Sequence, residues 1–356
     1  MERAGCTTPV LYRPGDTDLV SLLVFRIFKS LFLLGFLAAV AAFGWLWWFA
    51  HHPVKVGATA VEFTISPGSS LRRASRDIAR AGVPMPPWAF EAVVRVFGNP
   101  AEIKAGSYEM TADATPLELL GKITRGEYAM AEVKFIEGWT FRQMRDALDA
   151  HPRVRHDSKG LSDAEVLRSV GAALTSPEGL FFPDTYRFAR DSSDLEILRS
   201  AYQAMAKRLD AAWNQRQPDL PLTSSYQALI LASIVEKETG QPGERPLIAA
   251  VLVNRLRVGM KLQADPTVIY GLGERFDGNL RKRDLVTDTA YNTYTREGLP
   301  PTPIAMPSFA SIEAVMNPPR IDALYFVARG DGTSEFSSTL QEHNRAVTKY
   351  QRGGRL

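Results

Sequence analysis

A run of residues without charge near the start of the chain limits what the whole protein can be. Ser30 to Ala50 (SLFLLGFLAAVAAFGWLWWFA) contains no Asp, Glu, Lys or Arg over 21 residues. As an α-helix this run would be about 30 Å long, which is the thickness of the hydrocarbon core of a bilayer. Its tryptophans gather at the far end, where aromatic side chains favour the membrane interface. The run therefore predicts a single transmembrane helix at residues 30–50.

The residues around this run predict its orientation. Arg26 and Lys29 precede it, whereas only Lys55 and two histidines follow closely. Positive residues stay on the cytoplasmic side, so we expect residues 1–29 to be a cytoplasmic tail and the rest to lie outside the cytoplasm. A cleaved signal peptide is the alternative, because Ala58-Thr59-Ala60 resembles a cleavage site. The apolar run is longer than the roughly 7–15 residues of a signal peptide core, which favours an uncleaved anchor.

Composition argues against several classes of function. A formal net charge of +3, with no basic, aromatic-rich patch, gives no indication of nucleic-acid binding. Cys6 is the only cysteine, so no internal disulfide and no cysteine-based metal site can form. The histidines are scattered and form no HExxH motif. We therefore expect no metal site and no cofactor.

Short strand–turn–helix units follow the predicted anchor. Val61–Gly82 has the pattern of an alternating strand, a Pro-Gly turn and a helix, and Val133–His151 repeats it with Thr140 as helix N-cap. A third unit between them has a helix that ends at Gly126. Three such units predict an α+β fold and not a doubly wound sheet. The pattern suits a carbohydrate-binding module and equally a generic scaffold.

The remaining chain alternates helices with short apolar segments. We expect helices at Asp194–Trp213, Arg245–Val258, Ser311–Met316 and Leu340–Tyr350, and strand-like segments at Leu262–Gly273, Ala323–Arg329 and Ser334–Ser338. The aromatic segment Ser176–Phe188 (SPEGLFFPDTYRF) fits either a sugar-binding groove or a corner of the core.

The stretch Tyr226–Leu262 carries the main candidate for chemistry. The apolar residues Ala228–Val235 lead directly into Glu236-Lys237-Glu238. A carboxylate beside an apolar wall loses hydration, its pKa rises, and a carboxyl kept protonated near neutral pH can act as a general acid. The alternative is that both glutamates are solvated at the exposed end of a core helix.

Helix geometry separates the two glutamates. Residues two apart on a helix point about 160° away from each other, so Glu236 and Glu238 cannot act on one bond together. Glu238 shares its face with Leu231, Ile234 and Val235, which is the more apolar row. The sequence therefore favours Glu238 as the single acid.

Several separated motifs together resemble one known family. FFPDTY, ASIVEKET, VLVNRL, KLQADPTVIYG, AYNTYT and GLPPTPI occur in this order. They are similar to the motifs of the endolytic murein transglycosylase (YceG-like) family of bacteria, and the resemblance covers Val61 to the end of the chain. It implies a single-pass inner (plasma) membrane protein, a periplasmic LysM-like module at about 61–130 and a YceG-like catalytic domain at 131–356.

The resemblance also implies a reaction. Family members are lyases that cut nascent peptidoglycan strands between N-acetylmuramic acid and N-acetylglucosamine and leave a 1,6-anhydro end, which would terminate glycan elongation. The muramyl C6 hydroxyl is the nucleophile, so one glutamate suffices, whereas an ordinary glycosidase needs two carboxylates. The essential glutamate of the family corresponds to Glu238. By position in the motifs, further residues are expected to bind substrate: Glu236, Gln263, Asp265, Tyr291, Asn292, Thr293 and Tyr294.

Partners and alternative functions follow from the same resemblance. Peptidoglycan strands are the expected substrate, and peptidoglycan synthases are candidate partners. A non-catalytic peptidoglycan-binding scaffold of the synthesis machinery is the first alternative. A cytosolic, cofactor-dependent aminodeoxychorismate lyase, a description used for some relatives, is the second, and the predicted anchor argues against it. The intact Glu-Lys-Glu triplet and Tyr/Asn loop favour the transglycosylase.

Overall fold

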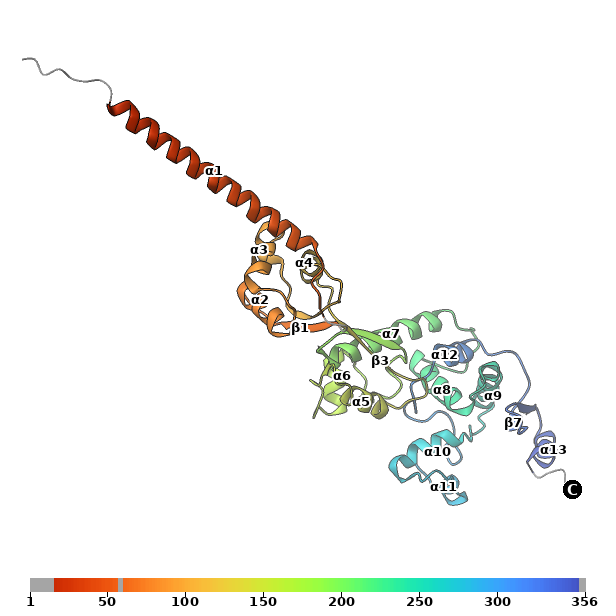
Figure 1. Ribbon diagram of the computed structural model, residues 1–356. Helices are drawn as coiled ribbons and strands as arrows, with labels where there is room; N and C mark the ends of the chain where they lie inside the picture. The colour runs from red at the N-terminus through yellow and green to blue at the C-terminus, as the bar shows by residue number, and fades with distance from the viewer. Residues whose placement is uncertain (1–15, 57–59, 352–356) are drawn as a thin grey trace, which may run out of the picture. The chain divides into compact units, whose positions relative to one another are not determined.

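The structure is a computed structural model that describes residues 16–56 and 60–351 (Figure 1). About half of the predicted cytoplasmic tail, including Cys6, lies outside the described residues, and so do Ala58 and Thr59. Contacts divide the chain into two compact units, residues 1–129 and residues 130–356. Each unit has its own buried hydrophobic core.

Helix α1 (Asp16–His51) is longer than the predicted run of residues 30–50. Among the described residues, its segment Leu23–His51 is the one helix long and apolar enough to cross a membrane. Every residue from 23 to 45 is exposed, although most of these side chains are apolar. Exposed Leu, Val and Phe side chains over this length are what a lipid bilayer would cover.

Besides the end of α1, the described part of the first unit contains two paired strands and three further α-helices. Its elements are β1 (Val61–Ile65), α2 (Leu71–Arg80), α3 (Pro87–Phe97), the 3-10 helix η1 (Pro100–Glu102), β2 (Gly106–Met110) and α4 (Pro116–Arg125). Strands β1 and β2 are antiparallel, with Phe63 opposite Tyr108 in the core. The predicted helix end at Gly126 is confirmed, because this glycine is the left-handed C-cap of α4, with φ of 77°.

Helix α3 was missing from the sequence-based expectation. It begins at Pro87, and its N-cap, Pro86, makes no side-chain hydrogen bond to the first turn. The usual Ser, Thr, Asp or Asn signal for a helix start is therefore absent, although proline at the first helical position suits a helix. The unit is α+β, and its likeness to a LysM module stays a prediction.

The second unit contains the larger core and the remaining elements. These are β3 (Met130–Lys134), α5 (Phe141–Asp149), β4 (Val154–Arg155), α6 (Asp163–Val170), β5 (Thr185–Ala189), β6 (Ser192–Ser193), α7 (Asp194–Asn214), α8 (Ser225–Glu238), η2 (Pro242–Glu244), α9 (Arg245–Arg257), α10 (Asp265–Leu272), η3 (Gly273–Arg275), α11 (Lys282–Val286), α12 (Phe309–Met316), β7 (Tyr325–Ala328), β8 (Ser334–Ser337) and α13 (Leu340–Tyr350). Strands β3 and β5 pair antiparallel, β4 and β6 pair parallel, and β7 and β8 pair antiparallel. The predicted α+β class is confirmed.

The strand-like prediction for Leu262–Gly273 is wrong. Most of this segment is helix α10, with Asp265 and Pro266 in its first turn. A short apolar run does not distinguish a strand from a buried helix segment, and an acidic residue followed by proline is a helix-start signal. The strand predicted at Ala323–Arg329 is confirmed only over the four residues of β7.

Helix α8 is the central element of the second unit. All residues from Ala228 to Val235 are buried, and the helix packs against α7, α9, α10 and α12. The side chain of Ser233 is satisfied inside this core, because its hydroxyl donates to Ile230 O at 2.7 Å and accepts from Ile304 N at 3.0 Å. The apolar surround and the bond to Ile304 fix where the C-terminal end of α8 lies.

Phe181 offers a test of how much this core depends on the aromatic segment. Its ring is fully buried and stacks on Phe141 with centroids 5.0 Å apart. Phe181→Ala should destabilise the second unit by about 3–5 kcal/mol, through lost burial and the cavity left behind. Urea unfolding of the detergent-solubilised full chain would measure this. The control Val286→Ala, at a side chain 75% exposed, should change stability by no more than about 0.5 kcal/mol.

Candidate active site

The two glutamates at the end of α8 have different surroundings. Glu238 is the last residue of the helix, and Thr239 follows in an extended conformation. Glu236 interacts with α12 and with Arg245, whereas Glu238 lies within electrostatic reach of Asp265 and Arg255. This is the separation that helix geometry predicted.

Glu236 is held within the protein. Its carboxylate accepts hydrogen bonds from Ser308 N at 2.9 Å and from the Ser311 hydroxyl at 2.7 Å. Arg245 forms an ion pair with it at 3.1 Å, and the Glu236 side chain is only 5% exposed. A negative charge at the N-terminus of α12 also interacts favourably with the helix dipole. These contacts are those of a residue that fixes α8 against α9 and α12.

Glu238 has a different character. It is half-buried, and within the described part of the chain its carboxylate makes no hydrogen bond and no ion pair. Loss of hydration and, secondarily, the negative charge of Asp265 raise the pKa of Glu238 to about 7, with Arg255 opposing the rise. A partly accessible carboxyl with this pKa is protonated in a large fraction of molecules at neutral pH. It meets the chemical requirement for a general acid.

Arg255 organises the backbone next to Glu238. It is 6% exposed, and its guanidinium donates to Leu324 O at 2.7 Å and to Leu262 O at 2.6 Å. Burial lowers its pKa, with nearby acidic groups including Glu238 opposing. The bond to Leu262 fixes the segment that leads into α10. In that segment the exposed Gln263 adopts a left-handed conformation with φ of 49°, which is uncommon for a residue with a side chain.

The loop that follows α11 is fastened to the same segment. Thr293 accepts a hydrogen bond from Ala264 N at 3.0 Å, and its carbonyl accepts from Gln263 N at 3.1 Å. The hydroxyl of Tyr294 donates to the carboxylate of Asp265. Burial, and then this hydrogen bond, raise the pKa of Tyr294, so the phenol stays protonated. Asp265, Tyr294 and Glu238 are thus brought together from three parts of the chain.

Asn292 serves the structure of the loop itself. Its side chain is 1% exposed, and its amide group donates to the carbonyls of Asp284, Leu285 and Thr287, the nearest at 2.7 Å. Its side-chain oxygen accepts from Tyr294 N at 2.8 Å. Asn292 therefore ties α11 to the loop and positions Tyr294.

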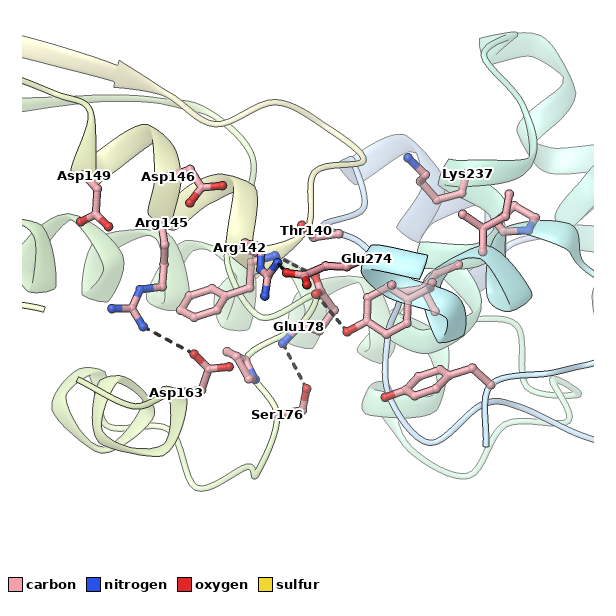
Figure 2. Close-up of a pocket in the computed structure, with 18 residues that line it drawn as sticks. Thr140, Arg142, Arg145, Asp146, Asp149, Asp163, Ser176, Glu178, Lys237 and Glu274 are labelled. Carbon is pink, nitrogen blue, oxygen red and sulfur yellow. Dashed lines mark hydrogen bonds and ion pairs between the residues drawn. The ribbon is translucent and has the colours of Figure 1, made fainter. Parts of the chain in front are cut away.

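A cavity of about 1070 Å³ opens beside this cluster (Figure 2). Lys237, Pro266 and Tyr291 line it, but neither Glu238 nor Asp265 does. Figure 2 shows Glu178 near its middle, with Lys237 toward one end and Asp149 toward the other. This cavity is therefore adjacent to the candidate acid, with residues next to Glu238 and Asp265 in the sequence forming part of its wall.

Glu178 is a second carboxyl that the sequence analysis did not select. It is 5% exposed, accepts from Phe141 N at 3.0 Å and accepts from the Tyr270 hydroxyl at 3.1 Å. Burial raises the pKa of Glu178 to about 7, although both hydrogen bonds act in the opposite direction. One feature of the sequence could have drawn attention to Glu178, because it lies within the aromatic segment Ser176–Phe188 that was considered as a sugar-binding groove. Nothing local indicated that Tyr270, far along the chain, would contact it.

The residues predicted to bind substrate divide into two groups. Asp265 and Tyr294 lie near Glu238, and Gln263 is exposed in the segment before Asp265. Tyr291 lines the cavity, where its hydroxyl bonds to Thr302 at 2.9 Å. Glu236, Asn292 and Thr293 have their side chains engaged inside the protein. Direct substrate contact by any of these residues stays a prediction.

Among the described residues, the second unit also contains a group of potential metal ligands, one of which, Asp149, lines the cavity. Side-chain donor atoms of Asp149, His156 and Asp194 lie within 4.8 Å of one another. Asp194 already accepts from the backbone and hydroxyl of Ser158, the shorter bond being 2.7 Å. These contacts account for its buried charge, and the expectation that the protein needs no metal stays a prediction.

Comparison with known proteins identifies the family. The profile of the YceG-like family matches residues 63–349, so the chain belongs to this family. The endolytic murein transglycosylase of Bacillus subtilis (strain 168) is 31% identical over 315 residues, which cover 83% of this chain and 86% of that protein. The endolytic murein transglycosylase of Streptococcus pneumoniae (strain D39) is 26% identical over 320 residues, covering 80% of this chain and 57% of the relative.

A solved structure supports the same relationship. The crystal structure of a YceG-like protein from Listeria monocytogenes matches with a TM-score of 0.50 and 30% identity. The match covers 80% of this chain and 98% of the Listeria chain. The resemblance inferred from the sequence motifs is therefore confirmed at the level of the family.

Glu236→Ala tests whether this glutamate fixes the position of α8. The change removes the closer ion pair of Arg245, leaving the one to Glu137 at 3.9 Å, and it removes the acceptor at the N-terminus of α12. Breaking a buried ion pair typically costs about 3–5 kcal/mol. Denaturant unfolding should show a loss in this range, and Glu236→Gln should lose less. The matched control is Glu313→Ala on the exposed face of α12. Wild-type stability in Glu236→Ala would contradict the anchoring role.

Proposed function

We propose that the protein is an endolytic peptidoglycan lytic transglycosylase, with Glu238 as general acid and then general base. The observation that carries the proposal is the unpaired, half-buried Glu238 carboxyl with a pKa of about 7. Membership of the YceG-like family and relatives named endolytic murein transglycosylase support it. The substrate is the nascent glycan strand, and the bond cleaved is the glycosidic bond between N-acetylmuramic acid and N-acetylglucosamine.

The proposed reaction uses one carboxyl twice. Protonated Glu238 donates its proton to the glycosidic oxygen while the bond from that oxygen to the muramyl anomeric carbon breaks. The muramyl C6 hydroxyl attacks the same carbon, and the Glu238 carboxylate accepts the hydroxyl proton. A 1,6-anhydro bond replaces the glycosidic bond, Glu238 ends protonated, and no water is consumed.

The surroundings of Glu238 suit both steps. Before cleavage, burial and the charge of Asp265 favour the protonated form that must donate. After donation, Arg255 lies near enough to stabilise the carboxylate that forms. Asp265 is itself held by the Tyr294 hydroxyl, so its charge stays close to Glu238. A second carboxylate is not needed as nucleophile, because the substrate provides its own.

The location of the enzyme is part of the proposal. Helix α1 would anchor the protein in the bacterial inner membrane by a single span, with the N-terminus in the cytoplasm and the catalytic domain in the periplasm. The first unit would act as a LysM-like module close to the nascent glycan strands of peptidoglycan. Peptidoglycan synthases are the partners that this placement suggests.

Glu238→Gln tests the catalytic assignment. Glutamine keeps the shape of the side chain but cannot donate or accept the proton, so the rate of strand cleavage should fall by about 100-fold or more. Mass spectrometry of purified glycan strands would measure the anhydromuramyl ends formed. The control Glu313→Gln should behave as wild type. Equal release of anhydro products by Glu238→Gln would contradict the proposal, and strand binding without cleavage by the wild type would favour the scaffold alternative.

The pH dependence of cleavage tests the same carboxyl. The reactive form is protonated Glu238, whose pKa is about 7, so kcat/KM should be level below that pH and fall about tenfold per pH unit above it. Glu178 also has a pKa of about 7, so its titration has to be distinguished from that of Glu238. The alkaline decline should persist in Glu178→Gln. Its disappearance in that variant would assign the titration to Glu178 instead.

A further inference from the structure

The end of α1 is built into the first unit. Leu46 is 8% exposed and Ala50 is fully buried, and both belong to the hydrophobic core that also contains β1 and α4. Just after the helix, Val54 N donates to Ala114 O at 3.1 Å. Helix α1 therefore packs into the core of the folded unit, so the position of this helix sets the position of the unit.

Helix α3 lies alongside this last part of α1 (Figure 1). The ring of Trp88 stacks on Trp45 with centroids 5.3 Å apart and an interplanar angle of 19°. At the other end of α3, the ring of Phe97 lies 6.4 Å from that of Phe43. Both ends of α3 thus contact α1 between residues 43 and 51.

The same part of α1 would coincide with the boundary of a bilayer. Lys29 is the last charged residue before the uncharged run. A helix needs about 20 residues to cross about 30 Å of hydrocarbon, which extends from Ser30 to about Phe49. Trp45, Trp47 and Trp48 are all more than 40% exposed here, as expected of aromatic residues at an interface. A helix packed on residues 43–51 must then lie at the same depth.

The free face of α3 has the composition of an interfacial surface. Trp88 is 62% exposed and Val96 is 50% exposed, and the Arg95 side chain is 61% exposed. Spacings of seven and eight residues place Arg95 and Val96 on the same side of the helix as Trp88. An exposed tryptophan and valine are unfavourable in water, whereas tryptophan favours the interface and arginine can extend its charge toward lipid phosphates.

We infer that α3 is a membrane-interface helix, with Trp88, Arg95 and Val96 contacting the headgroup–acyl boundary of the bilayer that α1 spans. The bilayer is the favoured occupant of this face because the face is continuous with the exposed tryptophans of α1. The inference rests on the proposed membrane span. It adds that the first unit lies against the lipid surface and is not merely tethered to it.

Site-specific lipid quenching tests the inference on the full chain. Cys6→Ser removes the native thiol, and single cysteines at Val96, Arg95, Val40 and Ser66 then carry an environment-sensitive fluorophore. Val40 lies in the exposed apolar part of α1, and Ser66 lies in the exposed turn between β1 and α2. The proteins are reconstituted in phosphatidylethanolamine–phosphatidylglycerol vesicles without a quencher, with lipids that carry a quencher at the top of the acyl chain, or with lipids that carry it near the end of the acyl chain, which reaches the depth of Val40.

The outcomes separate the inference from the span on which it depends. Interfacial helices lie about 5–10 Å into the headgroup–acyl boundary, so Val96→Cys and Arg95→Cys should be quenched on the order of twofold or more, while Ser66→Cys is not. Quenching at Val40→Cys without quenching at Val96→Cys and Arg95→Cys would overturn the interfacial helix and leave the span intact. Absence of quenching at Val40→Cys would overturn both. Equal quenching at Ser66→Cys would also overturn the inference, because the contact would then not be specific to α3.

Discussion

The burial of α8 is the constraint on which the candidate site depends. Eight consecutive residues, Ala228–Val235, are enclosed by neighbouring helices, so the position of the next turn is fixed within the core. Glu236 then completes a network with Arg245 and the start of α12. Because that glutamate is fully engaged, the end of the helix is rigid. Glu238 can remain unpaired at a defined position instead of moving to find a partner.

The unpaired state of Glu238 matters because burial without hydrogen bonds raises the pKa of its carboxyl toward the value that a general acid needs. A carboxylate that loses water without gaining hydrogen bonds becomes more basic, and a nearby Asp265 adds to the effect. The pKa of Glu178 rises to a similar value although this carboxyl accepts hydrogen bonds, because its side chain is buried, with 5% exposure. Two carboxyls near pKa 7 thus lie in one unit. Glu238 lacks a partner and is partly accessible, which distinguishes an acid available to a substrate from a buried structural carboxyl.

The two units contribute different constraints to the proposed function. In the second unit, contacts among α8, α10 and the loop after α11 assemble the candidate acid and its neighbours. In the first unit, aromatic contacts join α3 to the end of an apolar helix whose outward residues suit lipid. If α1 spans the membrane as proposed, an anchor that continues into a folded unit would restrict where the protein can work. This restriction is compatible with a substrate that is made at the membrane surface.

The sequence by itself determined the apolar helix, the α+β class, the family and the separation of Glu238 from Glu236 on the helix. Each of these depends on local pattern: an uncharged run, strand and helix periodicity, motifs in order, and the angle between residues two apart. Tertiary structure alone decided that Glu236 accepts a hydrogen bond from Ser308 and that Tyr270 reaches Glu178. Those outcomes depend on contacts between residues distant in the sequence, which no local periodicity encodes. The packing of α3 beside α1 belongs to the same class, because aromatic contacts across the fold place it there.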